Sequence, residues 1–161
     1  MPVEMTYDEK RLVRLARAMK SEEDGKALRK DMVKEFRGAL NPTRTKARAA
    51  IRAMPSKGHA GMKLRSRVAA KVMVQIRPTG KFPGATLKAK KTPNVRKFRN
   101  APKRLNQKSF RRPMIGNPRQ RVRQVGAPGW FDKTVRADRS AHKRAARNVI
   151  KAAEKRLRRK V

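Results

Sequence analysis

Residues 64–77 read LRSRVAAKVMVQIR, and this stretch decides whether the chain is wholly helical or also contains a sheet. In its first half, apolar residues stand four apart, as on one face of a helix. In its second half, Val72, Val74 and Ile76 occupy every second position, with Met73 and Gln75 on the other face, as in a half-buried strand. We predict a strand from about Val68 to Arg77, because β-branched residues dominate and the turn signal Pro78-Thr79-Gly80 follows. The sequence therefore predicts an α+β fold.

The part of the chain before this strand has the pattern of amphipathic helices. Apolar residues recur at spacings of three and four from Leu12 to Met19, and at strict four-residue steps from Leu28 to Leu40. Asn41-Pro42 is expected to end the second helix, because proline disfavours helical geometry in the residue before it. A shorter helix is predicted over residues 44–54.

The part of the chain after this strand is predicted to contain a basic arm, a hairpin and a last helix. Residues 78–108 are rich in proline, lysine and arginine and poor in apolar residues, which favours a long basic loop or arm. Ser109–Ile115 and Arg121–Val125 flank a Gly-Asn-Pro turn signal and predict a β-hairpin. The aromatic pair Trp130-Phe131 is expected to anchor the start of a helix over residues 132–159.

The composition predicts one domain over residues 1–161. A chain of 161 residues with 37% apolar residues can bury one modest core. We divide it into a helical region over 1–54, a β region over 62–131 with the basic arm at about 78–108, and a C-terminal helical region over 132–161. The expected core residues are Leu12, Leu28, Met32, Phe36, Val72, Val74, Trp130 and Phe131.

Charge is distributed very unevenly along the chain. The formal net charge is +36, and residues 41–131 hold 25 lysines and arginines without one carboxylate. Such a stretch cannot neutralise itself by internal salt bridges, so its repulsion must be offset by an external anion or by an acidic neighbouring protein. A solvated face kept for solubility accounts for short basic runs but not for one of this length. We therefore expect the middle of the chain to be an interaction surface.

The sequence excludes most catalytic and cofactor chemistry. There is no cysteine, and every carboxylate lies outside residues 41–131. His59 is expected in a solvated loop and His142 on a helix surface or in contact with phosphate, with no partner ligands at usable spacing. We predict no enzyme activity, no cofactor, no metal and no small-molecule substrate. No run approaches the roughly 20 apolar residues that span a membrane.

Nucleic acid is the obvious anionic partner, but the sequence supports only contacts that ignore base sequence. Aromatic residues make up 4% of the chain, too few for a stacking platform. No zinc-finger, helix-turn-helix or RNA-recognition signature is visible. Binding through phosphates should depend strongly on salt concentration.

The order of these segments resembles a family of phage proteins. Four short stretches carry the resemblance: Pro55-Ser56-Lys57-Gly58, Leu64-Arg65-Ser66, Phe110-Arg111-Arg112-Pro113-Met114-Ile115-Gly116-Asn117 and Pro128-Gly129-Trp130-Phe131. With an N-terminal helical region, an alternating strand and a C-terminal helix around them, the chain resembles the tail-completion or neck (head-to-tail connector) proteins of long-tailed bacteriophages. The run Gly-His-Ala-Gly-Met-Lys before Leu64 stands where these proteins commonly have a compact Thr-Gly.

The resemblance implies a structural virion protein at the head–tail junction or proximal tail, synthesised in the cytoplasm of the bacterial host. It implies a homo-oligomeric ring that contacts other connector and tail proteins, with no membrane partner. The basic surface is expected to contact either acidic neighbouring rings or packaged DNA, in the latter case without sequence preference. The residues that we expect to make anionic contacts are Lys88, Lys90, Lys91, Arg96, Lys97, Arg99, Lys103, Arg104, Arg111 and Arg112.

A ribosomal or nucleoid-type nucleic-acid-binding protein is the main alternative. Its support is a pI of about 12.0 and basic segments like those that thread between RNA helices. Such a protein should bind its RNA tightly and specifically as a monomer, whereas a connector should bind weakly and appear in virions. A secreted membrane-active protein is a distant third, because the apolar face of the C-terminal helix is mostly alanine.

Overall fold

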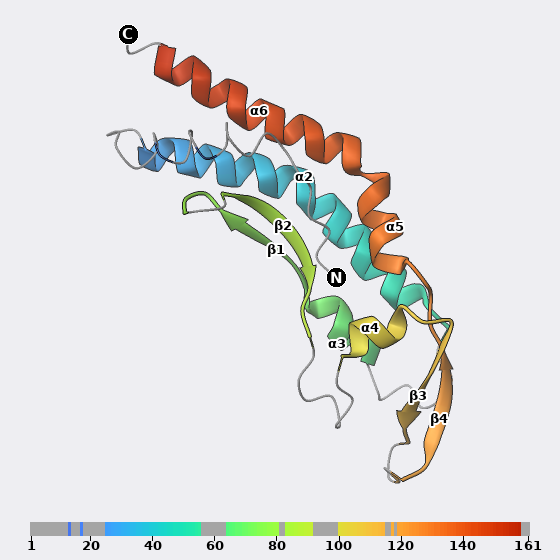
Figure 1. The fold of residues 1–161 in the computed structure, drawn as a ribbon. Coiled ribbons are helices and arrows are strands. Elements are labelled where there is room, and N and C mark those ends of the chain that lie inside the picture. The colour runs from blue at the N-terminus through green and yellow to red at the C-terminus, as the bar shows by residue number, and fades with distance from the viewer. Residues whose placement is uncertain are drawn as a thin grey trace.

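The computed structural model of the protein describes residues 13, 17, 25–55, 64–80, 83–91, 100–114, 117 and 119–158. Within these residues, helices are combined with two antiparallel hairpins, which confirms the predicted α+β fold (Figure 1). Leu12 and His59 lie outside the described residues.

The helix α2 (Gly25–Ala53) runs through Pro42 without ending. The predictions of a helix end at Pro42 and of a separate helix over 44–54 are therefore wrong. One stripe of buried side chains continues across the proline, and its burial offsets the hydrogen bond that proline cannot donate. The residue four positions earlier is Gly38, which has open space around it. The buried stripe comprises Leu28, Met32, Phe36, Leu40, Thr43, Ala47 and Ile51.

Residues 64–77 contain both a helix and a strand. The helix α3 (Leu64–Ala70) is followed, after one residue, by the strand β1 (Val72–Arg77). The predicted strand from Val68 thus begins four residues too early, since Val68 is fully buried on the last turn of α3. The helical spacing belongs to the first half of the stretch and the alternation to the second half.

The segment predicted as a long basic loop, residues 78–108, contains regular structure. The strand β2 (Gly84–Ala89) pairs antiparallel with β1 along its whole length, and α4 (Ala101–Leu105) follows further on. Leu87 and Leu105 from these elements are buried in the core. The prediction of a long basic loop is therefore wrong for the described parts of this segment. β2 is held by its pairing with β1 rather than by its own glycine- and alanine-rich composition.

The predicted second hairpin and C-terminal helix are present, the helix in two pieces. The strands β3 (Ser109–Pro113) and β4 (Arg121–Val125) pair antiparallel. The helix α5 (Trp130–Ala137) begins two residues earlier than predicted, and α6 (Arg139–Arg158) follows it after a break at Asp138. The single helix predicted over 132–159 is therefore wrong in this respect.

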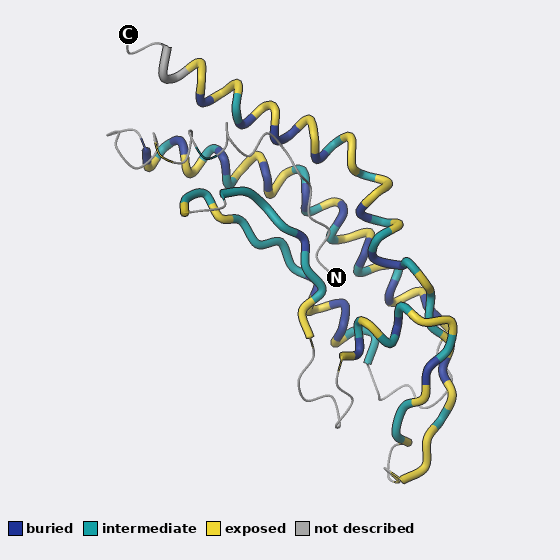
Figure 2. The backbone as a smooth tube through the Cα atoms, viewed as in Figure 1, coloured by how far each residue is buried: buried dark blue, intermediate teal, exposed yellow. Residues whose placement is uncertain are grey.

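The elements form layers around α2. Figure 1 shows α2 between α6 on one side and the β1–β2 hairpin on the other. The helices α3, α4 and α5 lie around the end of α2, and the β3–β4 hairpin extends beyond them at one end of the molecule. In Figure 2 the buried positions of α2 and α6 face each other, while most of β4 is exposed.

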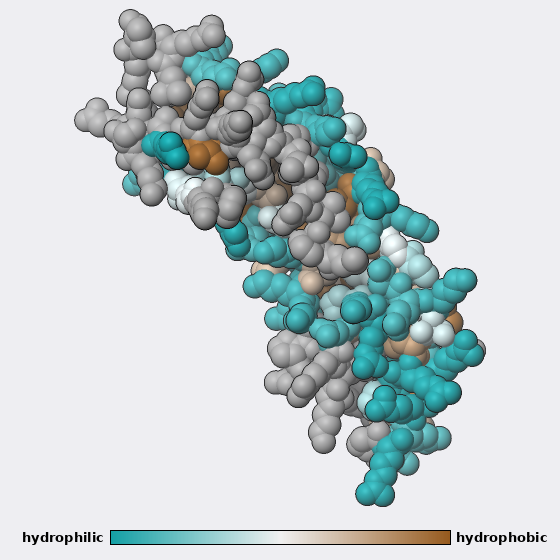
Figure 3. All heavy atoms as spheres, in the orientation of Figure 1, coloured by the Kyte–Doolittle hydropathy of each residue, from teal (hydrophilic) through white to brown (hydrophobic). Residues whose placement is uncertain are grey.

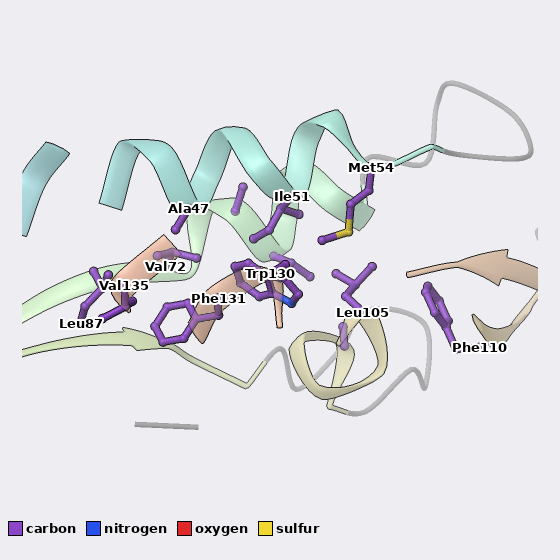
Figure 4. Packing of buried hydrophobic residues seen from close by; sticks show 13 residues of the cluster. Ala47, Ile51, Met54, Val72, Leu87, Leu105, Phe110, Trp130, Phe131 and Val135 are labelled. Atoms are coloured by element: carbon purple, nitrogen blue, oxygen red, sulfur yellow. The ribbon is translucent and has the colours of Figure 1, made fainter. Parts of the chain in front are cut away.

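Two hydrophobic clusters hold these layers together. The first lies between the beginning of α2 and α6 and is called the α2–α6 cluster; it contains Leu28, Met32, Phe36, Ala146, Val149 and Ala153. The second, called the Trp130 cluster, joins the end of α2 to α3, α4, α5 and both hairpins (Figure 4). Its aromatic centre is the edge-to-face pair of Trp130 and Phe131, whose ring centroids are 5.4 Å apart at 72°. Such pairs contribute about 0.5–1.5 kcal/mol beyond the area that they bury.

The core predictions are largely confirmed. Six of the expected residues are buried: Leu28, Met32, Phe36, Val72, Trp130 and Phe131. Val74 is half-buried and packs against the Trp130 cluster.

Candidate anion-binding interface

The β3–β4 hairpin has two chemically different faces. Its register sets Phe110 opposite Gln124 and Arg111 opposite Arg123. Because successive side chains of a strand point to opposite sides, these two pairs lie on opposite faces. We call the face of Phe110 and Gln124 the inward face, since both residues are buried. The outward face comprises Ser109, Arg111, Pro113, Arg121, Arg123 and Val125.

The outward face concentrates positive charge that its strand neighbours do not neutralise. Arg111, Arg121 and Arg123 are exposed. Residues directly opposite each other have Cβ atoms roughly 5 Å apart, and like charges in that position are destabilising. Residues 41–131 contain no carboxylate, and the next one along the chain, Asp132, is half-buried on α5. Any carboxylate or other anion that neutralises this face must therefore come from outside the hairpin.

The base of the hairpin is fixed to α4 through Gly126. The Gly126 N–H donates to the Lys108 carbonyl at 3.0 Å, and the Ala127 N–H donates to the Leu105 carbonyl at 2.9 Å. A Cβ atom on Gly126 would collide with the backbone oxygens of Gln107 and Leu105. Only glycine permits this close approach, so the hairpin leaves the body in one direction.

Arg65 ties the hairpin to the end of α2. Its guanidinium donates to the carbonyl of Pro55 and, at 3.4 Å, to the carbonyl of Val125. Burial lowers the pKa of Arg65, and the nearby guanidinium of Arg112 lowers it further. Arg65 is therefore used inside the fold rather than offered to a partner.

Arg48 is a second arginine with an internal role. Its Nε and Nη2 atoms donate to the Val72 carbonyl at 3.2 and 2.9 Å, across the junction between α3 and β1. Burial is the largest cause of its lowered pKa, followed by repulsion from Arg44 and Arg52 on the same helix. The basic composition thus serves folding at some positions and leaves charge on the surface at others.

The helix α6 carries a second cationic surface. Five exposed cations stand at four-residue steps along it: Arg139, Lys143, Arg147, Lys151 and Lys155. Like charges four residues apart on a helix repel one another. Figure 3 shows hydrophilic side chains over this side of α6 and over the hairpin end of the molecule.

The beginning of α2 carries a third cationic surface. A groove along it is lined by Lys26, Arg29, Lys30, Val33, Lys34 and Arg37. The Arg29 Nε atom donates to the Gly25 carbonyl at 2.9 Å, and the groove cations are exposed.

A buried polar cluster lies where α2 meets the break between α5 and α6. The Thr43 hydroxyl donates to Asp138 at 2.7 Å and lies 2.8 Å from Nε2 of His142. A hydroxyl has one hydrogen, so the His142 Nε2–H donates to the Thr43 oxygen. Lys46 donates to the other oxygen of Asp138 at 2.7 Å. The prediction that His142 lies on a helix surface or contacts phosphate is wrong, because its side chain is only 2% exposed.

The charges of this cluster are set by its surroundings. Hydrogen bonds from Lys46 and Thr43 lower the pKa of Asp138, so the carboxylate is ionised. Burial lowers the pKa of His142 despite the neighbouring carboxylate. Nδ1 of His142 is buried without a hydrogen-bond partner in the described structure, so a proton there would be unpaired. The cluster joins α2 to the break between α5 and α6, with the imidazole of His142 buried and Lys46 exposed.

Seven of the ten predicted anion-contact residues are described, and they lie on or next to β2, α4 and β3. Lys90 and Lys91 after β2, Lys103 on α4 and Arg111 on β3 are exposed, whereas Lys88, Arg104 and Arg112 are half-buried. Arg104 and Arg112 already make interactions within the protein. Arg96, Lys97 and Arg99 lie outside the described residues. The structure thus brings Arg111 together with Arg121 and Arg123, which the sequence analysis did not single out.

The predicted hairpin over residues 109–125 already indicated that Arg121 and Arg123 would lie near the arginines of the first strand. An antiparallel hairpin over 109–125 sets cations of both strands opposite each other, but only a defined register shows which ones meet. The row of cations on α6 was also present in the sequence, where lysine or arginine recurs every four residues from Arg139 to Lys155.

Neither metal chemistry nor membrane insertion is indicated within the described residues. They contain no group of three histidine, cysteine, aspartate or glutamate side chains placed to hold a metal ion. Among the described helices, none has both the length and the apolarity to cross a bilayer.

Comparisons with known proteins give no relative. No protein-family model matches the chain, no curated protein matches its sequence, and no solved structure matches its fold.

Proposed function

We propose that this chain is a structural protein of the head–tail junction or proximal tail of a long-tailed bacteriophage. It assembles as a ring that completes the tail and helps to join it to the head. Its basic surface contacts DNA or acidic neighbouring rings. The chain carries no catalytic role in this proposal.

One observation carries the proposal. The β3–β4 hairpin extends from the body with Arg111, Arg121 and Arg123 exposed on a face that has no carboxylate of its own. A protein that acts alone would be destabilised by such a face without benefit, whereas a component of an assembly presents it to an anionic neighbour.

The motifs behind the phage resemblance also meet in space. Met54 precedes the first motif, Leu64 begins the second, and Phe110 and Trp130 belong to the third and fourth. All four side chains pack in or against the Trp130 cluster. The hydrogen bonds of Arg65 to Pro55 and Val125 join the first two motifs to the hairpin. The described residues in or next to these stretches, distant in the sequence, thus pack around one cluster.

Ring formation should depend on the anionic neighbours. Subunits that each carry a net charge of +36 repel one another strongly in isolation. A closed ring therefore forms only where DNA or an acidic protein ring supplies the compensating charge. The purified subunit is therefore expected to remain monomeric until it meets the structure that it completes.

The test is to find the particle that contains the chain. We expect mass spectrometry of purified virions to detect it, with cross-links to proteins of the neck and proximal tail. Disruption of its gene should give DNA-filled heads and unattached tails, and wild-type protein supplied in trans should restore joined particles. Native mass spectrometry should show monomers of the purified chain, and oligomers after addition of its neighbouring rings.

Ribosomal subunits from the same infected cells are the matched control. Recovery of the chain in those subunits and its absence from virions would refute the proposal in favour of the ribosomal alternative. Joined, infectious particles after gene disruption would refute it as well.

A further inference from the structure

The outward face of the β3–β4 hairpin has a composition and geometry suited to one kind of anion. We infer that this face binds the sugar–phosphate backbone of duplex DNA, through Arg111, Arg121 and Arg123. The inference deepens the proposed function and rests on it for the source of the DNA, while the chemistry rests on the hairpin alone.

The first step is the register of the two strands. Arg111 stands directly opposite Arg123, and Arg121 lies two residues before Arg123 on β4, on the same face. Three guanidinium groups are thus held close together on a two-stranded ribbon. The repulsion between them is relieved when phosphates lie among them.

The second step is the choice of side chain. Every cation between residues 109 and 129 is an arginine, whereas the exposed ridge of α6 mixes lysine with arginine. The planar guanidinium donates two parallel hydrogen bonds to a phosphate, and it loses its hydration more readily than an ammonium group. A hairpin that served only to carry charge would not need this restriction.

The third step is the shape of the hairpin. It extends from one end of the body, and its packing within the described structure is chiefly with α4 at its base (Figure 1). The major groove of B-form DNA is about 12 Å wide and admits a two-stranded β-ribbon. The major groove of duplex RNA is too deep and narrow for side chains to enter. The shape therefore favours DNA over RNA.

The other cationic surfaces are less suited to this role. The ridge of α6 is part of a helix that lies flat along α2, and Glu154 stands among its cations. Its charges also wind around the helix as they advance four residues at a time. The hairpin alone among the described elements combines projection, arginine and the direct opposition of two cations.

The experiment compares two triple variants of the full-length chain that have the same net charge. The first is Arg111→Gln, Arg121→Gln and Arg123→Gln. The second, the matched control on α6, is Lys143→Gln, Arg147→Gln and Lys151→Gln. Binding to a fluorescent 24-base-pair DNA of arbitrary sequence is measured by anisotropy between about 0.05 and 0.3 M salt. Differences between variants carry the test, because any chain of this charge binds DNA to some extent.

We expect the hairpin triple to weaken DNA binding roughly tenfold or more near 0.1 M salt. Each lost phosphate contact should reduce the steepness of the log–log salt dependence by about 0.9, and three contacts by about 2–3. The α6 triple should change both quantities much less. Duplex RNA of the same length should discriminate less between the hairpin triple and the wild-type chain.

Equal losses in the two triples would overturn the inference, since binding would then follow net charge alone. Wild-type binding by the hairpin triple would overturn it too. Equal competition by polyglutamate at matched charge would mean that the hairpin recognises carboxylates of an acidic protein. If the hairpin triple fails to fold, Arg111→Lys with Arg123→Lys replaces it. This variant keeps the charge and should retain the salt dependence with weaker binding, and unchanged affinity would contradict the inference.

The outcome is distinguishable from that of the proposed function. If the chain is found in the virion neck but the hairpin triple differs from the α6 triple neither in affinity nor in salt dependence, the structural role stands and the DNA contact is refuted. If the hairpin triple loses affinity and salt dependence as expected but the chain is absent from virions, the DNA contact stands and the proposed location is refuted.

Discussion

The two hairpins of this protein are both two-stranded and antiparallel, but they pack differently. The β1–β2 hairpin lies along α2, with Val72 and Leu87 buried against it. The β3–β4 hairpin extends beyond α4, and its large side chains Met114 and Val125 are 43% and 44% exposed. The strands of the first hairpin contain two cations, Arg77 and Lys88, and those of the second contain four, Arg111, Arg112, Arg121 and Arg123.

The difference shows that the side chains paired across the strands determine whether a face of the hairpin can be buried. In the first, Val74 is opposite Leu87 and Ile76 is opposite Ala85, so one face is apolar on both strands and packs on the helix. In the second, one face pairs Arg111 with Arg123 and cannot be buried without an anion. The first hairpin packs on the body, whereas the second leaves an exposed cationic face.

The largest effect should come from the packed hairpin. Leu87→Ala removes a side chain that is 3% exposed and should lower the free energy of unfolding by about 2–5 kcal/mol. The paired variant Val125→Ala on the projecting hairpin should change it by less than about 0.5 kcal/mol. Urea denaturation of both variants measures the contrast, and similar losses would contradict the division between the hairpins.

The next effect should come from the base of the projecting hairpin. Gly126→Ala places a Cβ atom against the backbone oxygens of Leu105 and Gln107, and should lower stability by about 1–3 kcal/mol. Gly38→Ala is the matched control, since that glycine lies in the middle of α2 with nothing within 4 Å. Alanine there should stabilise the helix by roughly 0.5–1 kcal/mol. Thermal unfolding that moves in the same direction for both variants would argue against the close approach at Gly126.

Acid should loosen the packing between α2 and α6, on the side of α2 opposite the packed hairpin. The pKa of His142 is lowered by burial, so the unfolded chain takes up a proton near pH 6.5 while the folded chain resists it. Stability from this group is therefore present above about pH 6.5 and is lost as the pH falls below it. The pKa of Asp138 is lowered by its hydrogen bonds from Lys46 and Thr43, so its contribution is lost at still lower pH, below about 3.9.

Hydrogen exchange at pH 7 and pH 5.5 measures the acid effect. Protection should decrease in α2 and α6 more than in the β3–β4 hairpin. His142→Gln should remove the decrease, while His59 remains in both chains as an internal control. An unchanged response in this variant would show that the cluster is not the cause.

The smallest effect should be a gain in stability on the projecting hairpin. Arg123→Gln removes one of two like charges that stand opposite each other, and should stabilise the chain by about 0.2–1 kcal/mol at low salt. The gain should fade at 1 M salt, where charges are screened within about 3 Å. The control Arg77→Gln on β1 lies opposite Gly84 and should have no such effect. A gain that persists at high salt would point to a cause other than repulsion.

Periodic patterns predicted the elements whose own residues decide their structure. The alternation of Val72, Val74 and Ile76 and the turn before β4 both led to strands that exist. The sequence pattern did not predict elements whose structure depends on a neighbouring segment of the chain. β2 has one large apolar residue, Leu87, and becomes a strand because β1 supplies the other half of its buried face. Pro42 failed as a helix end because the buried stripe continues past it.

The candidate site was predicted in character but only partly in position. The excess of cations indicated an anionic partner, and Arg111 was among the expected residues. Arg121 and Arg123 were missed, because their importance depends on the register that pairs β4 with β3. The burial of His142 was missed for a similar reason. Thr43 interrupts an apolar stripe, and Asp138 precedes His142 by one helical turn. The contacts of Thr43 with these two residues, however, span 95 and 99 residues of sequence.

That polar contact has a consequence for how the two long helices are aligned. The contact face of α6 is rich in alanine, and side chains this small would fit against α2 almost as well if α6 slid along it by one turn. Sliding would separate Asp138 and His142 from Thr43 and leave the buried imidazole of His142 without its hydrogen-bond partner, a penalty of about 1–3 kcal/mol. The contacts among Thr43, Asp138 and His142 therefore fix the position of α6 along α2, which the alanine contacts alone do not specify.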